Sequence, residues 1–255
     1  MSVHDRVPRQ FASTARLFAA QDFLRLRHGH VGVVGLGGVG SWAAEALVRS
    51  GVGQLTMVDM DHVAESNLNR QVQATHASLG MEKGKALAAR LRDIAPGCAL
   101  TVLDEFMTPE SAPRILRDHY DAAGHIVWID ATDDLLAKRA MVLFMAESKR
   151  LKNLVVSGGA GGKTDPTRVE IADLSQTTHD ALLSTLRYDL RKRHGFPRLG
   201  KMSIQTIVCR EPTIKAEDCD PAAKLACAGY GSVVTVTATM GMVAASLAMK
   251  RLMER

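Results

Sequence analysis

Two cations in the first third of the chain, Arg70 and Lys83, are of the types needed for chemistry on phosphate. Arg70 lies in the stretch SNLNRQ together with Asn67, and Lys83 opens the next predicted helix. Such a positive pair neutralises the charge that grows on the β- and γ-phosphates as pyrophosphate leaves. A hydride-transfer site needs a flat nicotinamide pocket instead, so the pattern favours ATP over NAD. A polar loop followed by a solvated helix start is the structural alternative.

A glycine motif, GLGGVG, lies upstream of these cations. Gly35, Gly37 and Gly40 have the spacing GxGxxG, directly after a predicted strand and directly before a predicted helix. This arrangement allows a tight turn and brings the amides at the start of the helix close to a phosphate. Asp59, at the end of the next predicted strand, is placed to bind the ribose hydroxyls. The motif predicts a nucleotide site without identifying the nucleotide, and a glycine turn without a ligand stays open.

A carboxylate, Asp130, ends another predicted strand in the sequence IDATDD. Open α/β sheets bind their ligands beyond the carboxyl ends of the strands, where a carboxylate suits Mg²⁺. We therefore predict that Asp130 is a metal ligand. Helix capping is the alternative for the acidic residues of this stretch, and we expect it of Asp133 rather than of Asp130.

The elements that position these residues are short apolar runs that alternate with helical patterns. This order is typical of βαβ units and predicts an α/β fold with a doubly wound, Rossmann-like, mostly parallel sheet. The predicted strands cover residues 30–34, 54–58, 99–103, 126–129 and 154–156, and the predicted helices cover 38–50, 82–94, 109–118 and 134–151.

We divide the chain into three regions: a helical arm (1–29), an ATP-binding domain (30–175) and an extension that completes the same domain (176–255). The extension is expected to contain a basic helix over 181–193, a strand over 201–209, a mobile loop over 211–228 and a final helix. The basic segment from Arg187 to Lys201 is the best candidate for contacts with nucleic-acid phosphates, with a solvated helix face as the alternative.

The composition limits the class of protein. The chain has 255 residues and 46% hydrophobic content, enough for one substantial core, and a formal net charge of +5. This mild basic excess is compatible with a nucleic-acid partner but does not require one. The four cysteines form no CxxC pair, which argues against a four-cysteine zinc site and a disulfide framework. We expect Cys98 to be a core residue.

Two segments bear on location. Charges interrupt the first 30 residues throughout, so they do not resemble a signal peptide and we expect a cytoplasmic protein. Residues 229–249 carry no charge and are long enough to cross a bilayer. Because they are rich in Ser, Thr, Gly and Ala, we expect a buried helix there and no stable membrane insertion.

The glycine motif, SNLNRQ, Lys83 and DATDD, taken in this order, resemble the E1-like activating superfamily. The resemblance implies a doubly wound domain, usually a homodimer, that uses Mg-ATP to convert a carboxylate into an acyl-adenylate. It implies that the three glycines back the phosphates and that Asp59 holds the ribose. It further implies that Asn67, Arg70 and Lys83 engage the phosphates and that Asp130 binds the metal.

Further stretches resemble one branch of this superfamily: FASTARLF, SGGAGGKTDPTRVEIADLS and CAGYGSVVTVTATMG. Members of this branch are dehydratases that use ATP to cyclise the threonyl carboxylate of N6-threonylcarbamoyladenosine in tRNA into an oxazolone. The resemblance implies tRNA as a partner, with a cysteine desulfurase or sulfur-acceptor system as a further candidate.

The same branch suggests roles for three more positions. Arg16 matches an arginine that reaches the ATP site of the partner subunit. Cys227 matches a cysteine of the branch, and both a catalytic and an incidental thiol stay open. Residues 158–162, GGAGG, are expected to form a tight crossover loop, with carbonyl ligands to Na⁺ or K⁺ as the alternative.

Three other functions compete with this prediction. The closest is an adenylating activator of a ubiquitin-like sulfur-carrier protein, which the missing CxxC pairs disfavour because such relatives usually bind zinc. An NAD-dependent oxidoreductase does not explain Asn67, Arg70 and Lys83. A non-catalytic nucleotide sensor does not need the intact set of Arg70, Lys83 and Asp130.

Overall fold

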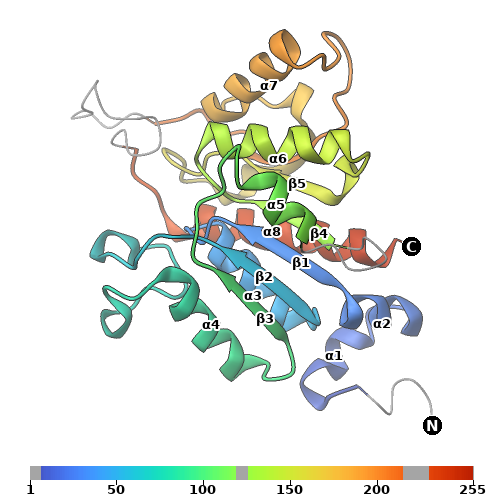
Figure 1. The fold of residues 1–255 in the computed structure, drawn as a ribbon. Helices are drawn as coiled ribbons and strands as arrows, with labels where there is room; N and C mark the ends of the chain where they lie inside the picture. Colours follow the sequence, from blue (N-terminus) through green and yellow to red (C-terminus); the bar gives the residue numbers. More distant parts are fainter. Residues whose placement is uncertain (1–6, 119–125, 215–229, 255) are drawn as a thin grey trace.

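The structure is a computed structural model that describes residues 7–118, 126–214 and 230–254 (Figure 1). These residues form a seven-stranded sheet with the order β3-β2-β1-β4-β5-β7-β6. The strands are β1 (His30–Val34), β2 (Gln54–Val58), β3 (Ala99–Leu103), β4 (Ile126–Asp130), β5 (Leu154–Ser157), β6 (Val169–Asp173) and β7 (Gln205–Cys209). The α-helices are α1 (Ala12–Ala15), α2 (Ala20–His28), α3 (Gly40–Ser50), α4 (Lys83–Ile94), α5 (Ala112–Asp118), α6 (Leu135–Glu147), α7 (Ala181–Arg193) and α8 (Val234–Met253).

The sheet confirms the predicted doubly wound, mostly parallel class. All neighbouring strands pair in parallel except β6, which pairs antiparallel with β7 at one edge. The first strand, β1, lies inside the sheet. The chain continues outward to β2 and β3 on one side of β1 and then returns to form β4 on the other side. Strand β6 was not predicted, because its alternation of polar and apolar residues reads as a loop beside the buried apolar runs.

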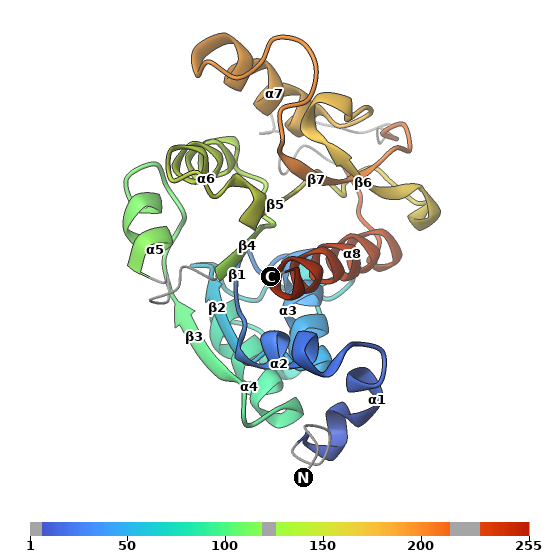
Figure 2. The same cartoon turned by 90° about the vertical axis from the view of Figure 1, so that its right-hand side faces the viewer.

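Helices cover both faces of the sheet (Figure 2). Helices α2, α3, α4 and α8 lie on one side, and α5, α6 and α7 lie on the other. Each face of the sheet has its own hydrophobic core. Because side chains of a strand point alternately to the two faces, Val33 of β1 lies in the core under α3 and α8, and Val34 lies in the core under α5 and α6. Burial on both faces explains why the central strands are apolar throughout.

The final helix, α8, packs along α3, on the same side of the sheet as α2 and α4. A Cβ at Gly241 would lie 2.5 Å from the carbonyl oxygen of Val39, so the glycine permits close approach of the two helices. Residues 234–249 therefore belong to a helix, as predicted, and one face of it is buried against α3 while Met242 is exposed on the other. Among the described residues, no helix is both long enough and apolar enough to span a membrane.

Helices α1 and α2 occupy part of the predicted N-terminal arm and cover one end of α3. A Cβ at Gly51, which follows α3, would lie 3.4 Å from both Phe11 and Phe23, and Arg27 donates to the Gly51 carbonyl at 2.9 Å. The glycine motif begins α3 at its other end. Because α3 has 11 residues, about 16 Å of helix separates these two ends.

Candidate active site

The candidate site lies where β1 and β4 run side by side and the chain direction changes. Their last residues, Val34 and Asp130, pair with each other, and Gly35 continues from β1 with its amide bonded to the Val58 carbonyl at 2.9 Å. A doubly wound sheet opens a crevice at such a point, beyond the carboxyl ends of the strands. The topology therefore brings the glycine motif and Asp130 to one crevice.

The glycine motif forms a tight turn that leads directly into α3. Gly35 has a φ of 84°, which favours glycine, and a Cβ at Gly40 would lie 1.8 Å from the Gly35 carbonyl oxygen. A Cβ at Gly37 would meet nothing within 4 Å. Within the described residues, no side chain caps the N-terminus of α3. The first amides of α3 and the open space beside Gly37 fit a bound phosphate.

We expect different effects when one methyl group is added at Gly40 and at Gly37. Gly40→Ala is expected to force the turn apart, at a cost of about 1–3 kcal/mol, and to lower the melting temperature by about 2–12 °C. Gly37→Ala is expected to keep the wild-type melting temperature but to lose stabilisation by ATP, because its methyl group occupies the phosphate space. Thermal unfolding with and without Mg-ATP measures both effects. Equal stabilisation of Gly37→Ala and wild type by ATP would place the phosphates elsewhere.

Asp59 follows β2 and joins the glycine turn to that strand. Its Oδ2 accepts from the amide of Leu36 at 2.5 Å, and its Oδ1 accepts from the amide of Asp61 at 2.8 Å. Burial raises the pKa of Asp59, although the positive charge of Lys83 acts in the opposite direction. A carboxylate oxygen has a second lone pair, so Asp59 can still accept from ribose hydroxyls.

Lys83 begins α4 and points to the same end of β2. It is only 6% exposed, and its Nζ donates to Asp61 Oδ2 at 2.7 Å. Its charge also acts on Asp59. The structure thus places Lys83 within electrostatic reach of Asp59 and adds Asp61, which the sequence analysis did not select. The contact of Lys83 with phosphate stays a prediction.

Arg70 lies directly against the glycine motif. A Cβ at Gly38 would lie 3.2 Å from Arg70 Cγ, and Arg70 Nη1 donates to the Ser66 carbonyl at 2.7 Å. Asn67 is buried nearby, and its Oδ1 accepts from the amide of Ala64 at 3.0 Å. Asn67 therefore closes a local turn, and its contact with phosphate stays a prediction.

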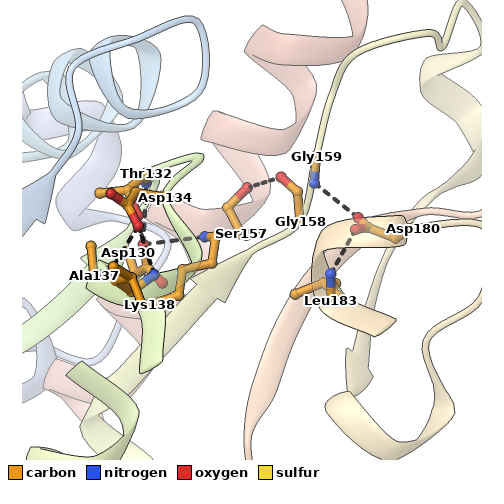
Figure 3. A network of polar contacts seen from close by, with 11 residues as sticks. Asp130, Thr132, Asp134, Ala137, Lys138, Ser157, Gly158, Gly159, Asp180 and Leu183 are labelled. Carbon is orange, nitrogen blue, oxygen red and sulfur yellow. Dashed lines mark hydrogen bonds and ion pairs between the residues drawn. The ribbon is translucent and has the colours of Figure 1, made fainter. Parts of the chain in front are cut away.

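Asp130 is completely buried, and its Oδ1 accepts from three groups, the first of which is the amide of Thr132 at 3.1 Å (Figure 3). Thr132 Oγ1 donates at 2.8 Å and Lys138 Nζ at 3.2 Å, while Asp130 Oδ2 has no hydrogen-bond partner among the described residues. This orphaned oxygen fits a metal ligand. The part of the chain that the structure describes contains no cluster of three His, Cys, Asp or Glu side chains suited to a metal. Mg²⁺ commonly uses one or two carboxylates together with substrate phosphates, which agrees with a single Asp130.

Lys138 is the main site residue that the sequence analysis missed. It is completely buried, and its Nζ also donates to the Ser157 carbonyl at 2.6 Å (Figure 3). The signal was available, because Lys138 shares the buried face of α6 with Ala137 and Met141 and is the one charged residue among the buried residues of this helix. One expectation was wrong, because the N-cap of α6 is Asp134 and not Asp133; Asp134 Oδ1 accepts from the amide of Leu136 at 2.6 Å.

The remaining predicted residues do not meet at this crevice within the described chain. Arg16 is exposed at the end of α1, in the arm that covers the far end of α3. Cys227 lies outside the described residues, as do positions 215–228 of the predicted mobile loop. Cys98 is buried in the core as expected, and burial raises the pKa of its thiol to about 11.

The GGAGG segment forms a tight crossover after β5. The amide of Gly158 donates to Ile207 at 2.8 Å, and the amide of Gly159 donates to Asp180 Oδ2 at 2.8 Å. The ammonium of buried Lys163 donates to the carbonyls of His179 and Glu211 at 2.9 and 2.5 Å. This geometry confirms the crossover loop and places a positive charge beside it.

The doubly wound sheet and the glycine turn beside Arg70, Lys83 and Asp130 define an E1-like nucleotide-binding protein. The chain belongs to the ThiF family, whose model matches residues 9–255.

Individual relatives match almost the whole chain. The tRNA threonylcarbamoyladenosine dehydratase of Haemophilus influenzae is 37% identical over 98% of this chain and 96% of that protein. The Escherichia coli protein of the same name is 36% identical over 99% of this chain and 97% of that protein. The crystal structure of the E. coli dehydratase, TcdA, in complex with ATP has a TM-score of 0.86, with 36% identity, and covers 99% of this chain and 97% of that one.

Proposed function

We propose that the protein is an ATP-dependent dehydratase that acts on N6-threonylcarbamoyladenosine in tRNA. It adenylates the threonyl carboxylate and cyclises it to the oxazolone, with release of AMP and pyrophosphate. The observation that carries this proposal is the 36–37% identity, over nearly the full length of both chains, to dehydratases of this name. The crevice built from the glycine turn, Asp59, Arg70 and Lys83 supports it independently, because it suits ATP.

Two steps account for the loss of one water. A carboxylate oxygen of the threonyl group attacks the α-phosphorus of ATP, and the bond from that phosphorus to the pyrophosphate oxygen breaks. The carbamoyl oxygen then attacks the acyl carbon, AMP departs, and the nitrogen loses its proton as the ring closes. Internal attack needs no protein nucleophile, since proximity supplies much of the rate. Cys227 is therefore not required by this chemistry.

The chain supplies charge and position for the first step. Arg70 and Lys83 approach the crevice from separate elements, where they offset negative charge on the leaving pyrophosphate. Asp130 would hold Mg²⁺ through its free Oδ2, and bound Mg²⁺ would neutralise phosphate charge. Lys138 and Thr132 fix the orientation of that carboxylate through Oδ1.

We also propose a homodimer, because Arg16 lies in the arm beyond the far end of α3 and cannot serve the glycine turn of its own chain. In a dimer it would reach the ATP site of the second copy. A cytoplasmic location, a cysteine desulfurase or sulfur-acceptor partner, and Na⁺ or K⁺ at residues 158–162 stay predictions. The Lys163 ammonium already supplies positive charge beside that segment.

The decisive experiment compares two acceptors of the adenylyl group. The protein is incubated with Mg-ATP and tRNA that carries threonylcarbamoyladenosine, and AMP release and nucleoside mass are measured. We expect stimulated AMP release and a product nucleoside lighter by one water. If this tRNA has neither effect, while a carrier protein with a C-terminal Gly-Gly becomes adenylated, the sulfur-carrier alternative replaces the proposal.

A further inference from the structure

A hollow of about 490 Å³ lies beside α7, outside the candidate active site. We call it the α7 hollow, and it is lined by Ser184, Arg187, Tyr188, Arg191, Lys192 and Arg198. Four of these six residues carry a positive charge, and no Asp or Glu is among the described residues that line the hollow. Asp189, on the same helix, is occupied elsewhere, because it pairs with Arg139 and Arg193 at 3.2 Å each. The hollow therefore has an uncompensated positive charge.

Two of the cations build the walls of the α7 hollow. Arg187 Nη1 donates to Thr177 Oγ1 at 2.6 Å and to the Leu174 carbonyl at 3.1 Å. Arg191 Nε donates to the Pro197 carbonyl at 3.0 Å and so holds the loop that carries Arg198. Burial lowers the pKa of Arg187, and repulsion from Arg191 lowers it further. An anion between them would relieve this repulsion.

The other two cations are available for a ligand. Arg198 is exposed and has no hydrogen bond or ion pair with any described residue. Lys192 is also exposed, and its Nζ donates to the hydroxyl of Tyr188 at 2.8 Å rather than to a carboxylate. Both side chains can therefore turn toward a phosphate without breaking an ion pair.

Tyr188 gives the α7 hollow a feature that phosphate alone does not need. The side chain is 59% exposed in the middle of α7, and the ammonium of Lys192 lies 5.2 Å from the ring centroid. Proteins that bind single-stranded RNA combine exposed aromatic rings, on which bases stack, with cations that follow the backbone. The exposed ring of Tyr188 beside the four cations fits a nucleotide better than an acidic peptide. An acidic peptide would pair with the cations but would have no base to stack on the ring.

Helix α7 starts at the same edge of the sheet as the active site. Asp180 caps α7 through the amide of Leu183 at 2.9 Å and also accepts from the amide of Gly159 at 2.8 Å, just beyond β5 (Figure 3). Strand β5 neighbours β4, where Val156 pairs with Asp130. Tyr188 follows Asp180 by about 12 Å of helix. We therefore expect one RNA molecule to contact the crevice and the α7 hollow together.

We propose that the α7 hollow binds one nucleotide of the RNA substrate, with its base stacked on Tyr188 and its phosphate held by Lys192 and Arg198. The inference rests on the proposed function and adds a second contact site for tRNA, away from the nucleotide that reacts.

The test measures binding of a labelled anticodon stem-loop RNA over a range of salt concentrations. Tyr188→Leu is expected to weaken binding by roughly 5- to 100-fold, while Tyr188→Phe keeps the ring and binds almost as wild type does. Arg198→Ala is expected to reduce the slope of log affinity against log salt by about 0.7–0.9. Arg193→Ala is the matched control, because it removes the same charge from a side chain that pairs with Asp189 outside the hollow.

The contradicting outcomes are distinct. If Tyr188→Leu binds the RNA as tightly as wild type, or if Arg193→Ala changes the slope as much as Arg198→Ala, the hollow is not the binding site. If polyglutamate binds with the same dependence on Tyr188, the ligand class is wrong. If modified tRNA does not stimulate AMP release by the wild-type protein, the proposed function is contradicted and the hollow is not. If only the Tyr188→Leu and Arg198→Ala variants lose RNA binding, the result supports the hollow as the binding site.

Discussion

Lys83→Ala is expected to release AMP about 10²–10³-fold more slowly than the wild-type protein, the usual cost of losing one donor aimed at developing charge. Its Nζ lies at the end of β2 beside Asp61 and its charge acts on Asp59, which places it at the predicted nucleotide site. The fold should persist, because Asp61 is about half exposed and becomes hydrated when its partner is removed. The measurement is steady-state AMP release with saturating tRNA substrate, together with the melting temperature.

Lys85→Ala is the control for this variant. Lys85 is on the same turn of α4, but its side chain is exposed, and Glu82 is its only ion-pair partner among the described residues. It should therefore retain AMP release. Arg70→Ala should lose turnover to a similar extent as Lys83→Ala, since Arg70 approaches from a separate element. Near-wild-type AMP release by Lys83→Ala or by Arg70→Ala would remove that residue from the site.

Lys138→Met is expected to be the most destabilising single substitution near the site. It leaves the carboxylate of Asp130 buried without its cation, a change that typically costs about 3–5 kcal/mol. For a chain of this size the melting temperature should fall by about 6–20 °C. Thermal unfolding without nucleotide measures the effect.

A double variant isolates the cause. Asp130→Asn in the Lys138→Met background removes the buried charge and should recover most of the lost melting temperature. Asp130→Asn alone should still bind ATP, yet it should release AMP slowly at every Mg²⁺ concentration. If the Lys138→Met protein is as stable as wild type, the buried carboxylate of Asp130 does not depend on this ion pair. If AMP release by Asp130→Asn responds to Mg²⁺ as wild type does, Asp130 is not the metal ligand.

The central strands and the glycine turn could be predicted from the sequence because local patterns determine them. Apolar runs of β-branched residues mark strands that are buried on both faces, and the spacing of Gly35 and Gly40 is required by one tight turn. Asp130 was found by the same logic, since it ends a strand. These features need no knowledge of distant residues.

The parts that could not be predicted depend on contacts between distant segments. Lys138 gains its role only when α6 folds back against the end of β4, and Asp61 becomes a partner of Lys83 only when α4 docks. Strand β6 is stabilised by pairing with β7, which follows it by a long connection. The exposure of Tyr188 likewise follows from the packing of α7 and not from its own sequence.

The close packing of α8 against the glycine turn determines when the nucleotide site can form during synthesis. A Cβ at Gly38 would lie 3.1 Å from Thr237 of α8, and Gly241 lies against the carbonyl of Val39. The turn is thus supported from behind by a helix that follows it far along the chain and is therefore synthesised much later. A nascent chain that contains β1, β2 and α3 but not α8 lacks this support, so we do not expect ATP to stabilise it. We therefore expect the site to fold only after α8 has left the ribosome, so that a shorter nascent chain stays incompletely packed.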